Sequence, residues 1–238
     1  MGHVKTGLGV VLALALSGCA PAGPAPTSPS VAATSAPPTT APAARRIVAG
    51  DVAECGPDCA VVVEVPLDDG GRFAALQGDA HGGGEPRALL VHRPPSGPDR
   101  VAEPAAFARV QTAVCAGQRC TAVLDVGAHG TAAVVLDLSG KVIVVAGRAG
   151  AGTPEGAVRD LDHDGRLDVV LRESTGEPSY AAAPRYWQTW RDDGGPGPAG
   201  GEDDPNPSSG SLVRTGCGPA TLDDVPEPTA LLTGPCPA

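Results

Sequence analysis

The chain has 238 residues, is rich in glycine (33) and proline (26), contains 3% aromatic residues, and carries a formal net charge of -10. Binding to nucleic acid through phosphate neutralisation needs clustered Lys and Arg, so this charge argues against a nucleic-acid partner. Val-rich runs are separated by Gly and Pro, and helix-like periods are few, which favours short strands joined by turns. We therefore expect a mainly β protein.

The first residues have the three parts of an export signal. Lys5 supplies a positive charge, the run from Leu8 to Leu16 is apolar, and small residues follow it. This run is shorter than the roughly 20 apolar residues that span a bilayer. We therefore predict a signal peptide over residues 1–18 and no permanent transmembrane helix.

The tetrad Leu16-Ser17-Gly18-Cys19 closes this signal. It resembles the lipobox of bacterial lipoproteins, and the resemblance implies cleavage before Cys19 and acyl lipid, including palmitate, on that residue. Acyl chains gain about 0.8 kcal/mol per buried methylene, so a multiply acylated Cys19 would hold the protein on a membrane. The expected location is the cell membrane, lipid-anchored and facing outside the cytoplasm; the alternative is an ordinary secretory signal with a chance cysteine.

Residues 19–45 comprise Cys19 and a segment built almost wholly from Pro, Ala, Thr, Ser and Gly. Such a composition offers little apolar surface to offset the entropy of ordering. Its prolines favour extended conformations, so we interpret the segment as a stalk. Residues 46–238 are then long enough for one β-rich domain with a sizeable core.

Six cysteines remain after Cys19 is set aside. An even count in an oxidising compartment predicts disulfides, and an alternative is a four-thiolate zinc site. The sequence spacing favours three pairs: Cys55 with Cys59, Cys115 with Cys120, and Cys217 with Cys236.

The segment Val158 to Leu171 reads V-R-D-L-D-H-D-G-R-L-D-V-V-L. In it, Asp160, Asp162, Asp164 and Asp168 occupy positions 1, 3, 5 and 9 of a calcium loop, and Arg166 would supply the carbonyl of position 7. Gly165 permits the sharp turn at position 6. The alternative is an Asp-rich turn that bonds its own backbone without metal. Leu171 replaces the Glu that an EF-hand requires at position 12, and the flanks favour strands.

This D-x-D-x-D-G-x-x-D pattern between strands resembles the calcium loop of FG-GAP and VCBS repeats, the blade unit of integrin-like propellers. The resemblance covers about one blade and implies that the four aspartates at 160–168 bind Ca²⁺ through their side chains. His163 departs from the Gly or Asn that is usual at position 4.

Comparable segments begin at Ala53, Ala113 and Ala157: a short strand, a constrained turn and an apolar strand. Turn signals follow the first two segments, at residues 68–71 (Asp-Asp-Gly-Gly) and at Ser139-Gly140, and predict meandering antiparallel strands. We hypothesise three copies of one unit, with the turn closed by a disulfide in two and by calcium in the third. The alternative is that any small disulfide-bonded β protein shows such patterns. The predicted fold is a disulfide-stapled antiparallel meander of blade-like repeats, as a partial or irregular propeller, with a β-sandwich as the alternative. Pro104 predicts one short helix through Val110.

The aromatic residues Tyr186, Trp187 and Trp190 lie close together. In a strand, Tyr186 and Trp190 face one side and Trp187 the other. The cluster is either a core, which burial energetics favour, or a stacking platform for a carbohydrate or protein ligand.

No G-x-S-x-G or H-E-x-x-H motif is present, and no phosphate-binding loop. This favours a binding or interaction module over an enzyme. The alternative is a cell-envelope hydrolase of unknown class.

Overall fold

The computed structural model describes residues 43–79, 84–127, 130–179, 182–195 and 209–237. The predicted signal peptide, Cys19 and the stalk up to residue 42 lie outside the described residues. The described residues form β-strands and one short 3-10 helix, η1 (Ala49–Asp51), and contain no α-helix. Over the same residues, no helix has the length and apolar character needed to cross a membrane. The chain is mainly β, as the composition predicts.

The first sheet, sheet 1, is an antiparallel meander in which each strand pairs with the next. Its strands are β1 (Ala60–Pro66), β2 (Arg72–Asp79), β3 (Pro86–Arg93) and β4 (Arg100–Ala102). The predicted turn at residues 68–71 joins β1 to β2, and Gly70 has a φ of 86° there. Glycine adopts this left-handed conformation without a steric penalty, which is why the chain reverses at this point.

The second sheet, sheet 2, repeats the meander and gains a short fifth strand from a later segment. Its strands are β5 (Arg109–Ala116), β6 (Arg119–Asp125), β7 (Thr131–Asp137), β8 (Val144–Ala151) and β12 (Ser209–Gly210). The turn predicted at Ser139 and Gly140 separates β7 from β8.

The third sheet, sheet 3, has the strand order β13-β11-β10-β9. Its strands are β9 (Gly156–Arg159), β10 (Asp168–Ser174), β11 (Arg185–Asp192) and β13 (Leu212–Cys217). The predicted Asp-rich loop joins β9 to β10, and all three strand pairings are antiparallel.

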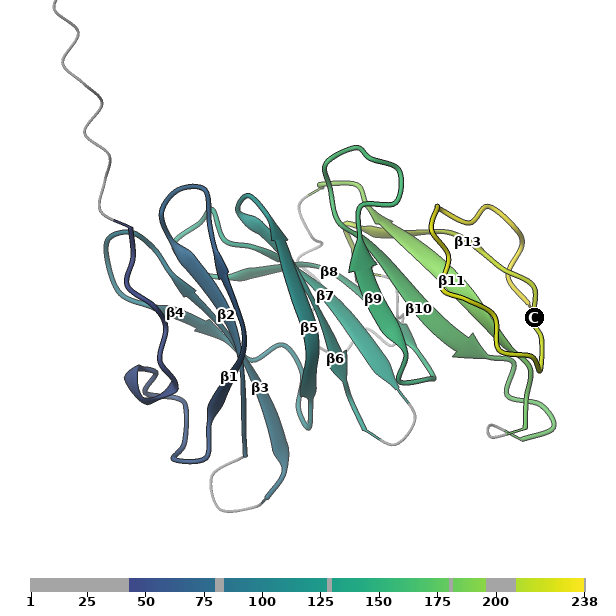
Figure 1. Ribbon diagram of the computed structural model, residues 1–238, viewed down its shortest axis with the longest axis horizontal. Helices are drawn as coiled ribbons and strands as arrows, with labels where there is room; N and C mark the ends of the chain where they lie inside the picture. Colours follow the sequence, from purple (N-terminus) through teal and green to yellow (C-terminus); the bar gives the residue numbers. More distant parts are fainter. Residues whose placement is uncertain (1–42, 80–83, 128–129, 180–181, 196–208, 238) are drawn as a thin grey trace, which may run out of the picture. The chain divides into compact units, whose positions relative to one another are not determined.

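Sheet 2 lies between the other two sheets (Figure 1). Alternate residues of a strand point to opposite faces. Val134 and Leu136 of β7 accordingly pack in a cluster with Phe73 and Leu90 of sheet 1. The intervening Ala133 and Val135 pack toward sheet 3 in a second cluster with Val169, Leu171 and Trp190. Burial on both faces explains why β7 reads as a continuous apolar run instead of an alternating one.

Irregular chain covers the outward faces of sheets 1 and 3. On sheet 1, Ile47 and Val52 of the segment before β1 pack on Leu76 and Val91. On sheet 3, the backbone N–H of Leu232 donates to Thr189 Oγ1 over 2.9 Å, so the segment after β13 lies along β11. Each sheet therefore has both faces covered, although sheets 1 and 3 are the terminal members of the stack.

Three disulfides staple the fold with the predicted pairing. Cys55 bonds to Cys59 before β1, and Cys115 bonds to Cys120 across the β5–β6 hairpin, where the two residues are register partners. Cys217 at the end of β13 bonds to Cys236 of the C-terminal segment. The pairing predicted from sequence spacing is confirmed.

The architecture is the predicted meander of blade-like repeats. Three successive four-stranded meanders stack in chain order, and over the described residues they do not close into a ring. Three layers also differ from the two of a β-sandwich.

The proposed alignment of the three repeats is wrong in its first copy. Cys120 lies in β6 and the Asp-rich loop leads into β10, and both strands are the second of their sheet. Cys59 instead precedes β1, the first strand of sheet 1. The turn at residues 68–71, and not the Cys55–Cys59 bridge, is the equivalent of the Asp-rich loop.

The helix predicted from Pro104 to Val110 is absent, and these residues form a turn that leads into β5. Phe107 has a φ of 55°, which a right-handed helix does not allow. Ala108 is fully buried in the cluster between sheets 1 and 2, so packing overrides the local helix signal.

Candidate metal site

The Asp-rich loop connects two strands that pair along their whole shared length. Asp168, the first residue of β10, is the register partner of Arg159, the last residue of β9. The loop thus starts and ends at one point of sheet 3. A loop of this kind directs its inward side chains to a common centre.

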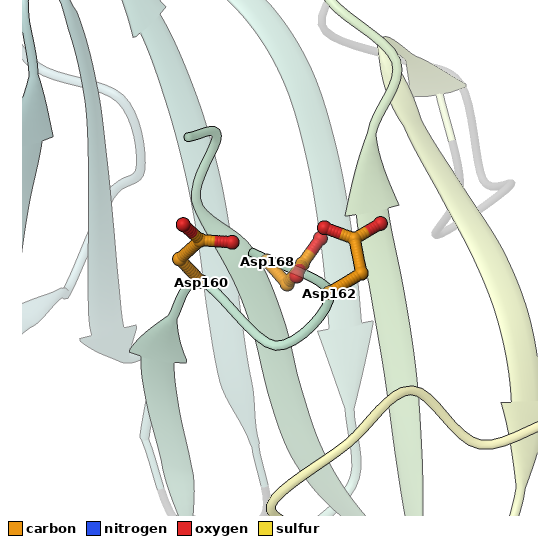
Figure 2. Close-up of side chains that lie close together, drawn as sticks. All are labelled: Asp160, Asp162 and Asp168. Atoms are coloured by element: carbon orange, nitrogen blue, oxygen red, sulfur yellow. The ribbon is translucent and has the colours of Figure 1, made fainter. Parts of the chain in front are cut away.

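Three of the predicted ligands meet in the structure. Asp160, Asp162 and Asp168 each offer a carboxylate oxygen, and these oxygens all lie within 4.8 Å of one another (Figure 2). Oxygens that bind the same Ca²⁺ at about 2.3–2.6 Å are at most about 5 Å apart. The spacing of the three oxygens therefore fits one shared ion.

One further predicted side-chain ligand, Asp164, lies outside this group. Asp164 Oδ1 accepts a hydrogen bond from the backbone N–H of Arg166 over 2.8 Å, and Asp164 N–H donates to Asp162 Oδ1 over 3.2 Å. The carboxylate of Asp164 thus stabilises the turn itself. The structure brings together the side chains at loop positions 1, 3 and 9 and leaves that of Asp164 out of the cluster. The ligand predicted at position 7 is the backbone carbonyl of Arg166, and it stays a prediction.

Asp168 is fully buried. Its Oδ2 accepts a hydrogen bond from the backbone N–H of Leu161 over 2.8 Å, and its Oδ1 is buried without a hydrogen-bond partner among the described residues. Burial, followed by the negative charges of Asp162, Asp164 and Asp160, raises the pKa of Asp168 to about 6. Among the residues that the structure describes, no Lys, Arg or His forms an ion pair with Asp168.

One carboxylate oxygen of Asp160 also has no hydrogen-bond partner among the described residues. Asp160 Oδ2 accepts from the backbone N–H of Gly165 over 3.1 Å, whereas Oδ1 is buried and unpartnered within the described part of the chain. Buried polar atoms are normally hydrogen-bonded or bound to an ion, because desolvation is otherwise uncompensated. These two oxygens, from the two ends of one loop and without a partner among the described residues, are suited to bind a cation.

The backbone of the loop has two residues in the left-handed region. Gly165 has a φ of 85°, as expected for position 6 of such a loop. His163 has a φ of 61°, which explains why Gly and Asn are usual at this position in the loops that it resembles. His163 is exposed and is not part of the oxygen cluster.

The donor set is composed of oxygen atoms alone. Hard cations such as Ca²⁺ prefer carboxylate and carbonyl oxygens and tolerate irregular geometry, whereas Zn²⁺ favours sulfur and nitrogen donors. The donor set of Asp160, Asp162 and Asp168 therefore suits Ca²⁺ better than Zn²⁺.

A contact between sheets 2 and 3 lies beside the loop and was not anticipated. Arg119 of β6 donates from Nη2 to Asp192 Oδ1 of β11 over 2.8 Å, and a second hydrogen bond joins Nε to Oδ2. Both residues line a cavity of about 100 Å³ together with Arg166 and Leu167 of the loop. The partners are 73 residues apart, so no local pattern could reveal the pair.

The predicted aromatic platform is largely enclosed. Tyr186 is 7% exposed and Trp190 is 2% exposed. Trp187 faces the other side of β11, as predicted, and its indole N–H donates to the carbonyl of Val225 over 3.1 Å. The guanidinium of Arg172 lies 5.5 Å from the centre of the Trp187 ring. These positions favour the core interpretation, because Tyr186 and Trp190 have almost no exposed ring surface on which a ligand could stack.

Comparison of the chain with models of protein families, with curated proteins and with solved structures finds no match.

Proposed function

We propose that the protein is an exported lipoprotein whose β domain is a calcium-stabilised binding module on the outer side of the cell membrane. Lipid on Cys19 would anchor it, and residues 19–45 would hold the domain away from the bilayer. The anchor rests on the export signal and the lipobox-like tetrad. The proposal of a calcium-stabilised module is supported by the carboxylate oxygens of the loop between β9 and β10.

One observation carries the calcium part of the proposal. Asp168 is fully buried, its Oδ1 has no hydrogen-bond partner among the described residues, and one of its carboxylate oxygens lies within 4.8 Å of oxygens of Asp160 and Asp162. An uncompensated buried carboxylate destabilises a fold, and a bound cation would remove that cost. Because the loop joins two strands of sheet 3, an ion here would stiffen the sheet and its contact with sheet 2.

Isothermal titration of the purified full chain in detergent tests the calcium site. We expect one Ca²⁺ to bind with a Kd of about 0.1 to 1 mM, as in other extracellular modules. Asp168→Asn should weaken binding at least tenfold. The matched control Asp223→Asn, which changes an exposed carboxylate on the C-terminal segment, should bind as the wild type does. No binding by the wild type at about 10 mM, above the expected Kd, would contradict the proposal.

The anchor has its own test. In a bacterial host, the wild-type chain should partition into the detergent phase, and its first tryptic peptide should begin at Cys19 and carry acyl mass. Cys19→Ser should lose the acyl mass and keep the signal peptide. A mature wild-type chain that starts elsewhere, without lipid, would contradict the anchor and leave the calcium test unaffected.

A further inference from the structure

We propose that the protein binds a neutral sugar residue in a surface cleft of about 410 Å³, here called the Phe107 cleft. The cleft is lined by Pro86, Phe107, Arg109, Asp125, Gly127 and Pro154. Its volume lies within the roughly 300–1,000 Å³ of small-molecule sites. The inference rests on the proposed function as a binding module and names its ligand class.

Sheets 1 and 2 and the connection that leads into sheet 3 take part in the Phe107 cleft. Pro86 begins β3 of sheet 1, Asp125 ends β6 of sheet 2, and Pro154 lies in the connection from β8 to β9, which leads into sheet 3. Gln111 of β5 holds this connection in place, because its Nε2 donates to the carbonyl of Pro154 over 2.6 Å. The cleft therefore combines strand ends at Pro86, Arg109 and Asp125 with residues of three different connections.

Phe107 is held outward at a conformational cost. The chain has two phenylalanines: Phe73 is fully buried in the core, whereas Phe107 is 55% exposed. The φ of Phe107 is 55°, a left-handed conformation that is rare for bulky residues. The adjacent Ala108 is fully buried and fixes the turn. Strained residues of this kind concentrate at functional sites, where the surrounding structure enforces them.

The cleft has two charged side chains: Arg109 can donate hydrogen bonds and Asp125 can accept them. Arg109 of β5 and Asp125 of β6 are register partners, so both side chains project near the same strand end. Asp125 Oδ1 accepts from the backbone N–H of Gly127 over 2.9 Å, which orients the carboxylate. No ion pair joins Arg109 to Asp125 among the described residues, so each can bond to a ligand.

This combination selects a sugar over an ion. A pyranose ring has an apolar face of C–H groups that stacks on an aromatic ring, and its hydroxyls both donate and accept. Phe107 supplies the ring, Arg109 donates and Asp125 accepts. Because Arg109 and Asp125 carry opposite charges, the cleft has no net electrostatic attraction for an anionic or a cationic ligand. Both side chains can form hydrogen bonds with neutral hydroxyl groups.

Binding of defined probes to the full chain in detergent, by saturation-transfer NMR and titration calorimetry, tests the proposal. The neutral probes are cellotetraose, chitotetraose, mannotetraose and isomaltotetraose; the competing probes are tetragalacturonate and decaproline. We expect at least one neutral probe to bind. Binding of none of the four, or of decaproline or tetragalacturonate alone, would overturn the inference.

Three variants localise the binding. Phe107→Gly removes the ring and relieves the left-handed strain, so it should fold at least as well as the wild type and bind at least tenfold more weakly. Phe107→Tyr keeps the ring and should bind within threefold of the wild type. Leu222→Gly removes another exposed apolar side chain, 77% exposed, and should have no effect. Equal binding by Phe107→Gly and the wild type would overturn the assignment.

Calcium titration of the same variants separates this inference from the proposed function. Phe107→Gly should bind Ca²⁺ as the wild type does. A chain that binds Ca²⁺ but no neutral probe overturns the sugar site and leaves the calcium site intact. A chain that binds a neutral probe through Phe107 but no Ca²⁺ supports the sugar site and contradicts the calcium site.

Discussion

Arg119 of sheet 2 and Asp192 of sheet 3 form a two-point hydrogen-bonded ion pair, in which Nη2 of Arg119 lies 2.8 Å from Oδ1 of Asp192. Asp192 is 2% exposed. Burial raises its pKa, but hydrogen bonds, above all from Arg119, outweigh this effect and bring the pKa below its usual value. The folded pair therefore favours the charged carboxylate.

Replacing Arg119 by Met should lower the free energy of unfolding by about 3 kcal/mol at pH 7, because Asp192 is left as a buried, unpaired charge. The folded-state pKa of Asp192 lies below its unfolded value of about 3.9, so the pair contributes stability above that pH and loses it as the pH falls. The cost of Arg119→Met should accordingly shrink below about pH 4. Urea unfolding at a series of pH values measures it.

The surface ion pair of Arg159 with Glu227 provides the control for this experiment. Arg159→Met should produce no comparable pH-dependent difference, because solvent screens an exposed pair. A cost of Arg119→Met that stays constant from pH 7 to pH 3 would show that lost packing, and not the charge on Asp192, is responsible.

Calcium should raise the thermal stability of the chain. For a Kd of about 0.1 to 1 mM, Ca²⁺ at about 10 mM adds roughly 1.4 to 2.7 kcal/mol to the free energy of unfolding. For a domain of this size, the melting temperature then rises by about 3 to 10 °C. Differential scanning calorimetry with Ca²⁺ or with chelator measures the difference, and Mg²⁺ should give a smaller one.

Asp164→Ala is the informative variant in this assay. The structure uses the Asp164 carboxylate to accept from the backbone N–H of Arg166, whereas the loop pattern assigns it to the ion. We expect Asp164→Ala to abolish the calcium-dependent rise, because position 5 of such a loop is a ligand. A variant that is destabilised but still responds fully to Ca²⁺ would restrict Asp164 to shaping the turn.

Two substitutions in the loop should change stability in opposite directions. His163→Gly places glycine at a φ of 61° and should stabilise the protein by about 0.5 to 1 kcal/mol, since the strain relieved exceeds the entropy lost. Gly165→Ala puts a Cβ at a φ of 85° and should cost about 1 to 2 kcal/mol. Chemical unfolding with chelator present excludes any contribution from bound metal. Shifts of equal sign would refute the assignment of strain to these residues.

Removal of the Cys217–Cys236 disulfide should free the C-terminal segment from sheet 3. The bond closes a sequence separation of 19 residues, so Cys217→Ala with Cys236→Ala should cost about 3 kcal/mol. The fluorescence of Trp187 should shift to longer wavelength, because its indole N–H loses the carbonyl of Val225.

The Cys55–Cys59 bridge serves as the comparison for the loop-closure effect. It closes a separation of 4 residues, constrains the unfolded chain less, and its double Ala variant should cost less. An equal cost for the two double variants would argue against the entropic explanation.

Local features of this fold were predictable from the sequence. The turn at residues 68–71 and the Cys115–Cys120 hairpin depend on a few neighbouring residues, and both are where the sequence predicts them. The convergence of Asp160, Asp162 and Asp168 also follows from spacing within one loop.

Features that depend on packing between distant segments were not predictable. Phe107 follows a proline that suggests a helix, yet the burial of Ala108 between two sheets enforces a turn. The Arg119–Asp192 pair joins strands of different sheets. Burial energetics favour a core position for Trp190, but they do not identify the face of sheet 2 that covers it. One strand alone does not reveal which neighbour covers it.

The coverage of both outer faces has a consequence for how the molecule responds to damage. Within the described residues, sheet 2 is the shared neighbour of sheets 1 and 3, so the three units resemble a short repeat array with a cap at each end. In such arrays stability is roughly the sum of the units and the interfaces between adjacent ones. Loss of the C-terminal cap should thus loosen sheet 3 first and leave sheet 1 protected, and unfolding should travel along the stack from the damaged end.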